Sequence, residues 1–240
     1  AERWYPPPVQ RAYLIPAYRA SRSLAQVLGD LRALDPEGAL LVVDDGSTDG
    51  TGDIARASGI DVVTHDTNLG KGMALKTGFA WLAERGFETA VTVDADGQHR
   101  ADDAVMLAKH SAPARAIVLG IRDLKRDGAP GPSQFSNRFS NWWVSRFAGQ
   151  RLSDTQCGLR RYPLHATLDL GSDARGYGFE CDMLVRAARR GIPIVEVPVH
   201  VFYPPKAERV SHFHVVADPA RIVVRLLHTA FTVKRTAKGP

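Results

Sequence analysis

The sequence predicts an α/β fold in which a mixed, mostly parallel sheet is flanked by helices. The first observation is that short β-branched or apolar runs alternate with segments of helical periodicity through residue 100. The second is that several of these runs are almost wholly apolar, as expected for strands covered on both sides. With 240 residues, of which 44% are hydrophobic, the chain can bury one large core or two small ones.

The first half of the chain repeats a strand followed by a helix. Strands are expected at 12–15, 39–43, 61–65 and 89–93, and the helices between them at 24–34, 50–58 and 70–85. Pro16 is expected to end the first strand, because proline has no N–H to donate to a ladder. Asn68 is a good N-cap for the helix that begins near Gly70. Right-handed crossovers would make these strands parallel.

The second half of the chain is less regular. We expect helices at 101–111, 135–148 and about 176–190, a strand at 115–120, a mobile polar loop at 123–134 and an edge or irregular strand at 192–201. Trp142, Trp143 and Phe147 predict that the helix at 135–148 faces the core, with a membrane-facing helix as the alternative.

The tail from about residue 219 predicts an amphipathic helix. At about 100° per residue, one narrow stripe carries Arg221, Arg225, His228 and Arg235, and the rest of the surface is mainly apolar. Such a helix fits an interfacial position on a membrane, and it equally fits docking on its own domain. Both alternatives stay open at this point.

The charge balance favours an anionic partner. The net charge is +5 and the isoelectric point about 9.4, which suits nucleic acid, nucleotide diphosphates or an acidic membrane surface. The basic residues are scattered and no nucleic-acid reader motif is present, so we expect no nucleic-acid partner. Two cysteines without metal-type spacing, no apolar run of about 18 residues and no signal-peptide pattern predict a cytoplasmic protein.

A candidate metal site follows the strand at 89–93. In an extended chain, residues two apart point the same way, so Asp94, Asp96 and Gln98 would present oxygens on one side. Oxygen ligands suit Mg²⁺ or Mn²⁺, which often bind one or two carboxylates together with substrate phosphates. The alternative is an ordinary polar turn, because aspartate is a common turn former.

Two further polar segments follow strands in the first half. Asp44 and Asp45 end the strand at 39–43, where carboxylates could accept hydrogen bonds from a nucleobase or from ribose hydroxyls. Lys71 lies at a helix N-terminus, which attracts phosphate, although a solvated lysine is the simpler interpretation. Capping of the following helix by Ser47, Thr48 or Asp49 is expected but does not explain two adjacent carboxylates.

Five motifs in fixed order resemble glycosyltransferase family 2 with the GT-A fold, and most closely its dolichyl- or polyprenyl-phosphate sugar synthase branch. The motifs are Ile15-Pro16-Ala17-Tyr18, Val43-Asp44-Asp45-Gly46-Ser47, Asn68-Leu69-Gly70-Lys71-Gly72, Val93-Asp94-Ala95-Asp96-Gly97-Gln98 and Ser153-Asp154-Thr155-Gln156-Cys157-Gly158. The resemblance covers about residues 12–213. It divides the chain into a lead-in at 1–11, a glycosyltransferase domain at 12–218 with a nucleotide half at 12–122 and an acceptor half at 123–218, and the helix at 219–240.

The resemblance implies an inverting transfer of a sugar from a nucleotide diphosphate, with Mg²⁺ or Mn²⁺ held by Asp94, Asp96 and Gln98. With Lys71 added from its helix terminus, the residues expected to bind the nucleotide sugar are Pro16, Tyr18, Asp44, Asp45, Lys71, Asp94, Ala95, Asp96 and Arg122. The held cation, Arg122 and Lys71 would stabilise the departing diphosphate. A polyprenyl phosphate or another lipid-linked acceptor implies a peripheral position at the inner face of the cell membrane.

The chain departs from the family pattern in three places. Arg19-Ala20 stands where Asn-Glu is usual, and Gly131-Pro132-Ser133 stands where a second phosphate-binding arginine is usual, with Arg138 as the nearest substitute. The late motif, with lysine in relatives, is expected to bind acceptor phosphate here through Arg209, Ser211 and His212.

These departures leave the acceptor open between a lipid phosphate and a hydroxyl. A hydroxyl needs a carboxylate to take its proton, and Asp154, in a polar turn, is the first candidate. Glu180 and Asp182 are the next candidates, although both also suit a helix N-terminus. A nucleotide-binding protein of the same fold without turnover is a third hypothesis.

Overall fold

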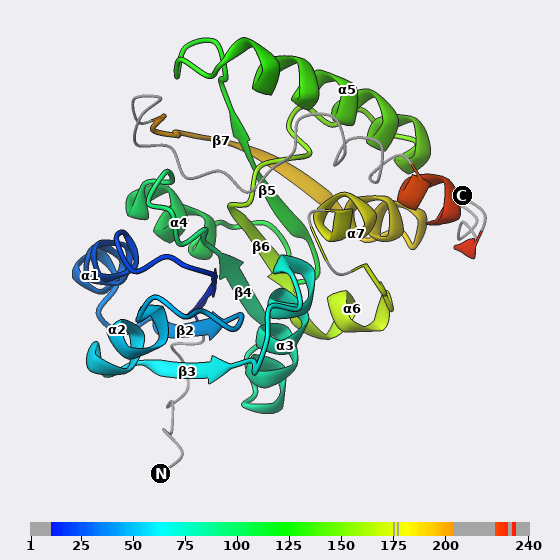
Figure 1. The fold of residues 1–240 in the computed structure, drawn as a ribbon. Helices are drawn as coiled ribbons and strands as arrows, with labels where there is room; N and C mark the ends of the chain where they lie inside the picture. The colour runs from blue at the N-terminus through cyan, green and yellow to red at the C-terminus, as the bar shows by residue number, and fades with distance from the viewer. Residues whose placement is uncertain (1–10, 175, 177, 204–223, 230–231, 234–240) are drawn as a thin grey trace.

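The computed structural model describes residues 11–174, 176, 178–203, 224–229 and 232–233 (Figure 1). Within them, seven strands form one sheet in the order β3-β2-β1-β4-β6-β5-β7. The strands are β1 (Arg11–Ala17), β2 (Ala39–Asp44), β3 (Asp61–Thr64), β4 (Thr89–Thr92), β5 (Ile117–Arg122), β6 (Arg160–Pro163) and β7 (Ile194–Val199). β6 is antiparallel to both of its neighbours and all other pairs are parallel, so the predicted mixed, mostly parallel sheet is confirmed.

Helices cover both faces of the sheet, and one buried apolar cluster lies under each layer (Figure 1). One layer contains α1 (Leu24–Leu34), α2 (Thr51–Ala57) and α4 (Ala101–Ala108). The other contains α3 (Lys71–Glu84), α5 (Gly131–Ala148), α6 (Leu164–Asp169) and α7 (Gly178–Arg189). The apolar character of β1 and β2, in which nearly every residue is buried, follows from this double coverage.

The prediction that Pro16 ends the first strand is wrong. β1 continues to Ala17, with Pro16 in register with Val43 of β2. Pro16 lies beyond Leu14 and Thr92, the last paired residues of β1 and β4, so its missing N–H removes no hydrogen bond from the β1–β4 ladder. The edge position predicted for the strand near 192–201 is confirmed, because β7 pairs only with β5 and carries Pro198.

α5 begins earlier than predicted and faces the other way. It starts at Gly131, and Pro132 lies in its first turn, where a missing N–H costs no helical hydrogen bond. Trp142 is 61% exposed, whereas Ser136, Asn137 and Ser140 are buried against the domain. The prediction that the tryptophan-rich face of this helix forms the core is therefore wrong for Trp142.

The described part of the tail docks on the domain. Residues 224–229 are helical, with Leu226 fully buried in the core beside α7 and Val224 exposed to solvent. Thr229 and Arg225 both donate hydrogen bonds to the buried carboxylate of Asp182 on α7. The remainder of the helix predicted at 219–240, like the lead-in before residue 11, lies outside the described residues.

Candidate active site

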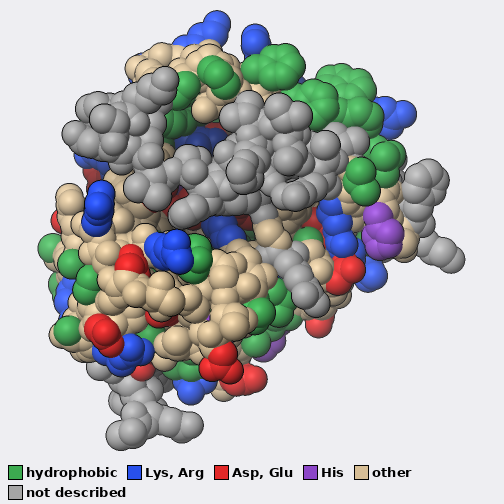
Figure 2. Space-filling view, viewed as in Figure 1, with side chains coloured by type: hydrophobic (Ala, Val, Ile, Leu, Met, Phe, Trp, Pro, Cys, Tyr) green, Lys and Arg blue, Asp and Glu red, His purple; other side chains and the backbone are tan. Residues whose placement is uncertain are grey.

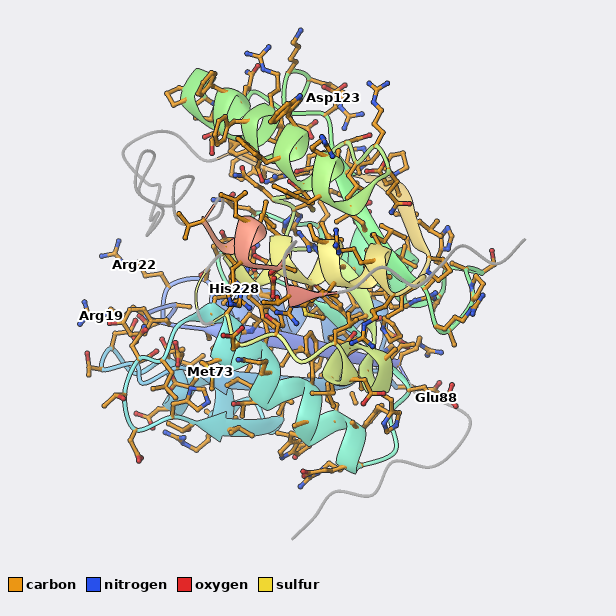
Figure 3. The ribbon with its side chains drawn as sticks, turned by 90° about the vertical axis from the view of Figure 1, so that its right-hand side faces the viewer. Arg19, Arg22, Met73, Glu88, Asp123 and His228 are labelled. Carbon is orange, nitrogen blue, oxygen red and sulfur yellow. The ribbon has the colours of Figure 1, made fainter. Side chains whose placement is uncertain are left out.

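The polar residues that follow β1, β2, β4 and β5 belong to one edge of the sheet, because parallel strands end on the same side. In Figure 3, Arg19 and Arg22, which follow β1, lie on the opposite side of the molecule from Glu88, which precedes β4. In open α/β sheets, ligands bind at the carboxyl ends of the strands. The site is therefore built from the loops that follow the carboxyl ends of these strands.

Lys71 joins two acidic side chains at the centre of the site. Its Nζ lies 2.6 Å from Asp94 Oδ1 and 3.2 Å from Glu180 Oε1. Lys71 is the first residue of α3, Asp94 follows β4, and Glu180 is in the first turn of α7. Burial opposes the ionisation of Asp94, but Lys71, together with His99 and Arg122, outweighs it and lowers the pKa of this carboxyl. Three elements far apart in sequence thus converge around one cation.

Asp96 is electrostatically coupled to Asp94. Although the Asp96 side chain is exposed, the protein around it partly desolvates the carboxyl, and this, followed by the negative charge of Asp94, raises the pKa of Asp96 to about 6. Its Oδ1 accepts a hydrogen bond from the Gln98 N–H, which holds the side chain at the loop. Two carboxylates close enough to repel each other are stabilised together by a shared cation.

This donor set fits Mg²⁺ or Mn²⁺. The ligands are hard oxygens, and the Lys71 ammonium against Asp94 already marks a position that attracts positive charge. Among the described residues, no group of three or more His, Cys, Asp or Glu side chains is arranged to hold a metal ion. Asp94 and Asp96 would therefore share the ion with Gln98 and with oxygens of the substrate.

Gly158 allows Asp94 to take its position. A Cβ built on Gly158 would collide with both carboxylate oxygens of Asp94. Arg160, which is fully buried, also holds the nearby loop in place. It donates hydrogen bonds to the carbonyl oxygens of Cys157, Thr155 and Glu180. Arg160 was missed by sequence reasoning, since the position of an arginine in a strand does not reveal that it is buried.

Asp45 organises the loop that carries Lys71. Its carboxylate accepts hydrogen bonds from the Leu69 and Gly70 N–H groups, at 2.9 and 2.8 Å, and lies 2.7 Å from the Nδ1 of His65. The helix α3 has Gly70 as its N-cap without a side-chain cap, so the capping role predicted for Asn68 is wrong. Asp45 instead accepts hydrogen bonds from the N–H groups of Leu69 and Gly70 at the start of the helix.

Asp44, Pro16 and Tyr18 lie around the end of β1 and β2. Asp44 is buried and its Oδ1 accepts the Ser47 N–H at 3.1 Å. The next residue after Tyr18, Arg19, has a φ of 51° and its guanidinium stands 5.3 Å from the centre of the Tyr18 ring. A left-handed conformation is one that asparagine tolerates better than arginine, which gives a physical reason for the asparagine usual in the family motif.

Arg122 and Asp154 form a buried ion pair. Arg122 Nε and Nη2 donate to the two carboxylate oxygens of Asp154 at 2.7 and 2.9 Å, and Asn137 Nδ2 donates to Oδ1 at 2.5 Å. Burial alone would raise the pKa of Asp154, but Arg122 reverses this and lowers it. Both carboxylate oxygens of Asp154, the first candidate for a general base, thus accept hydrogen bonds from Arg122 or Asn137, and the carboxylate is paired with a cation.

The other two candidate bases are also engaged. Asp182 is fully buried and accepts hydrogen bonds from Ser172, Arg186, Arg225 and Thr229. These hydrogen bonds join α7 to the helical turn at 224–229. Glu180 remains in the site, where its Oε1 lies 3.2 Å from the Lys71 ammonium.

His99 is a site residue that sequence reasoning missed. Burial, together with the positive charges of Arg122 and Lys71, lowers its pKa to about 4 despite the opposing charge of Asp94. Among the described residues its buried Nδ1 has no hydrogen-bond partner. The only available signal was its position directly after Gln98.

The comparisons with known proteins agree with this geometry. The family model described as glycosyl transferase family 2 matches residues 13–163. The chain belongs to glycosyl transferase family 2. It is a glycosyltransferase by this membership, and the resemblance predicted from the five motifs is confirmed.

Relatives of this family 2 member include enzymes of lipid-linked sugars. The undecaprenyl-phosphate mannosyltransferase of Micrococcus luteus is 37% identical over 202 residues, which are 78% of this chain and 81% of that protein. The polyprenol monophosphomannose synthase of Mycolicibacterium smegmatis is 29% identical over 205 residues, 80% of this chain and 77% of that protein.

Solved structures confirm the GT-A fold. The glucosyl-3-phosphoglycerate synthase of Mycobacterium tuberculosis, crystallised with UDP, superposes with a TM-score of 0.68 at 19% identity. The match covers 92% of this chain and 80% of that chain. The same synthase has been crystallised with Mn²⁺ and UDP-glucose.

Of the residues predicted to bind the acceptor of this family 2 member, Arg138 alone lies within the described part of the chain. Arg138 is exposed on α5, whereas its neighbour Asn137 is the residue that reaches Asp154. Arg138 therefore does not take the place of a phosphate-binding arginine beside Arg122. Arg209, Ser211 and His212 lie outside the described residues.

Gly158→Ala is expected to lower the affinity for Mn²⁺ by ~10-fold or more, because the added methyl group displaces the Asp94 carboxylate. Mn²⁺ binding is measured by electron paramagnetic resonance in the presence of a nucleoside diphosphate. Gly29→Ala is the matched control, since a Cβ there meets nothing within 4 Å. An unchanged affinity in Gly158→Ala, with the fold intact, would remove Asp94 from the metal site.

Proposed function

We propose that the protein transfers a sugar from a nucleotide diphosphate to a polyprenyl phosphate, with inversion at the anomeric carbon. The observation that carries the acceptor assignment is the state of the three candidate bases. Asp154 is paired with Arg122, Glu180 with Lys71, and Asp182 is buried among donors. A phosphate acceptor needs no base, because its attacking oxygen is already anionic, whereas a hydroxyl acceptor does.

The residues of the chain supply the binding and the charge. Asp94 and Asp96, with Gln98, would hold Mg²⁺ or Mn²⁺, which supplies positive charge for the departing diphosphate. Lys71 adds a further positive charge from the N-terminus of α3, and Arg122 adds one from the end of β5. Pro16, Tyr18, Asp44 and Asp45 would form the wall for the base and ribose, with Asp45 acting through the loop that it fixes.

The sugar to test first is mannose. The two relatives compared above carry mannose in their names. A third relative, from Methanococcus voltae, is named for N-acetylglucosamine transfer to dolichyl phosphate, so the acceptor class is shared more widely than the sugar. The names of the relatives therefore support a polyprenyl phosphate as the acceptor more strongly than they support mannose as the transferred sugar.

We further propose that the protein works in the cytoplasm, against the inner face of the cell membrane where its acceptor resides. Among the described residues, each helix is too short or too polar to cross a bilayer. A polyprenyl phosphate places its phosphate at the membrane surface, because its hydrocarbon chain partitions into the lipid. A transferase at this surface therefore has direct access to its acceptor.

The test is release of nucleoside diphosphate from GDP-, UDP- and dTDP-sugars with Mg²⁺ or Mn²⁺, with and without polyprenyl phosphate. Release that requires the lipid phosphate is the expected result. Release with a hydroxyl acceptor alone would favour the second candidate, in which Glu180 takes the proton. Nucleotide binding without release under any condition would indicate a non-catalytic protein.

A further inference from the structure

α5 buries polar residues in its first half, whereas Val144 and Ala148 are its buried apolar residues near the C-terminus. Ser136, Asn137 and Ser140 are almost fully buried, and Asn137 and Ser140 form hydrogen bonds with Asp154 and Thr155. The aromatic side chains lie outward, with Phe135 64%, Phe139 37% and Trp142 61% exposed. An ordinary surface helix shows the opposite arrangement, with its apolar face toward the core.

The exposed rings of Phe135, Phe139 and Trp142 are joined into one continuous surface by Trp143 and Phe147, which are partly buried and pack against the core on their other side. Phe135 stacks on Phe139 with ring centroids 6.5 Å apart, Phe139 contacts Trp143 at 6.3 Å, and Trp143 contacts Trp142 at 4.8 Å. Phe147 stacks on Trp143 at 5.8 Å and extends this surface along the helix. Figure 2 shows hydrophobic side chains gathered along the edge where Figure 1 places α5. We call this surface the α5 aromatic face.

The charge beside the α5 aromatic face is positive. Arg138, Arg146 and Arg151 are exposed, and no Asp or Glu occurs between residues 131 and 151. With 3.6 residues per turn, Phe135, Phe139, Trp142 and Arg146 fall within about 60° of one another around the helix. A basic helix with exposed tryptophan and phenylalanine is typical of peptides that lie in the interface of an anionic bilayer.

We propose that the α5 aromatic face binds the surface of an anionic lipid bilayer, with the rings at the boundary of headgroups and acyl chains. A second copy of the chain is a poorer partner, because a two-fold interface would bring Arg138 and Arg146 against the same arginines. The proposal rests on the proposed function for its purpose, since a polyprenyl phosphate resides in such a surface. The Arg122–Asp154 pair lies on the inward side of the same helix, about one helix diameter (~10 Å) from the membrane.

The experiment is sedimentation with phosphatidylcholine vesicles that do or do not contain phosphatidylglycerol, without donor or acceptor. The wild-type protein is expected to sediment with the phosphatidylglycerol vesicles, and less so as salt is added. The variant Phe135→Ser/Phe139→Ser/Trp142→Ser is expected to lose at least ~10-fold in partition coefficient, because three rings no longer leave water. The matched control Leu34→Ser/Leu69→Ser/Met106→Ser changes exposed apolar residues elsewhere and is expected to bind like wild type.

A second measurement keeps the test valid if the triple variant fails to fold. The tryptophan fluorescence of the wild-type protein, which has four tryptophans, is expected to be quenched in part by brominated lipids, and Trp142→Phe is expected to lose a large share of that quenching while still binding. Arg146→Gln/Arg151→Gln is expected to lose the preference for phosphatidylglycerol.

Three outcomes would overturn the proposal. They are no sedimentation of wild type with any vesicle, equal binding by the triple variant, or a wild-type dimer that the triple variant converts to monomer. Transfer to a water-soluble, short-chain polyprenyl phosphate separates this inference from the proposed function. A wild type that binds vesicles through α5 but transfers no sugar refutes the proposed function alone, and the reverse result refutes only the membrane face.

Discussion

Asp96→Asn is expected to reduce metal-dependent sugar transfer by ~10³-fold or more, because a neutral amide cannot hold the cation that offsets the charge of the departing diphosphate. The measurement is the rate of nucleoside diphosphate release at saturating Mn²⁺ and donor. Asp102→Asn, an exposed carboxylate on α4 that pairs with Arg100, is the matched control and should keep wild-type turnover. Wild-type turnover in Asp96→Asn would show that the metal site lies elsewhere.

The same substitution is expected to stabilise the metal-free protein at neutral pH. The pKa of Asp96 is raised to about 6 by partial desolvation and by Asp94, so the folded state binds this proton more tightly than the unfolded state does. The cost of ionising Asp96 therefore develops as pH rises from about 4 to about 6 and is constant above that. The melting temperature of Asp96→Asn should exceed that of wild type at pH 7.5 and match it near pH 4, measured with a metal chelator present.

Asp154→Ala is expected to destabilise the fold by about 3–5 kcal/mol, because it leaves the Arg122 guanidinium buried without its counter-ion. Urea denaturation measures the change in the free energy of unfolding. Asp123→Ala, an exposed carboxylate next to Arg122 in sequence, is the matched control and should change stability by less than about 0.5 kcal/mol.

The double variant Arg122→Met/Asp154→Leu separates stability from function. It removes both charges together, so much of the lost stability should return. Sugar transfer should stay low, because the arginine that would contact phosphate is gone. If Asp154 were instead a catalytic base, Asp154→Asn would remove the acidic limb from the pH–rate profile, where activity falls as the base is protonated.

The sequence predicted the sheet best where the residue pattern of a strand also indicates the place of that strand in the fold. β1, β2 and β4 are apolar runs followed by acidic residues, and that pattern located the edge of the sheet at which Asp44 and Asp94 lie. The antiparallel insertion of β6 was not predicted, since a four-residue strand containing Arg160 and Arg161 carries no apolar periodicity. Both arginines are buried through hydrogen bonds to carbonyl oxygens that come from distant segments.

The failures at the site have a common physical origin. The composition of α5 suggests an aromatic core helix, but its buried side is polar because it must reach Asp154. Asp154 resembled a free base because its sequence neighbours are polar, and its partner Arg122 is 32 positions away. Residue types can be listed from a sequence, but which donors saturate a carboxylate depends on contacts between elements.

The place of β6 has a consequence for how the chain is assembled during synthesis. β6 lies between β4 and β5, although it is made after both of them. Until residues 160–163 leave the ribosome, β4 and β5 each expose an unsatisfied backbone edge, which is a template for aggregation. The predicted nucleotide half at 12–122 and acceptor half at 123–218 therefore cannot mature one after the other as separate units, and chaperone dependence of the nascent chain should concentrate in this interval.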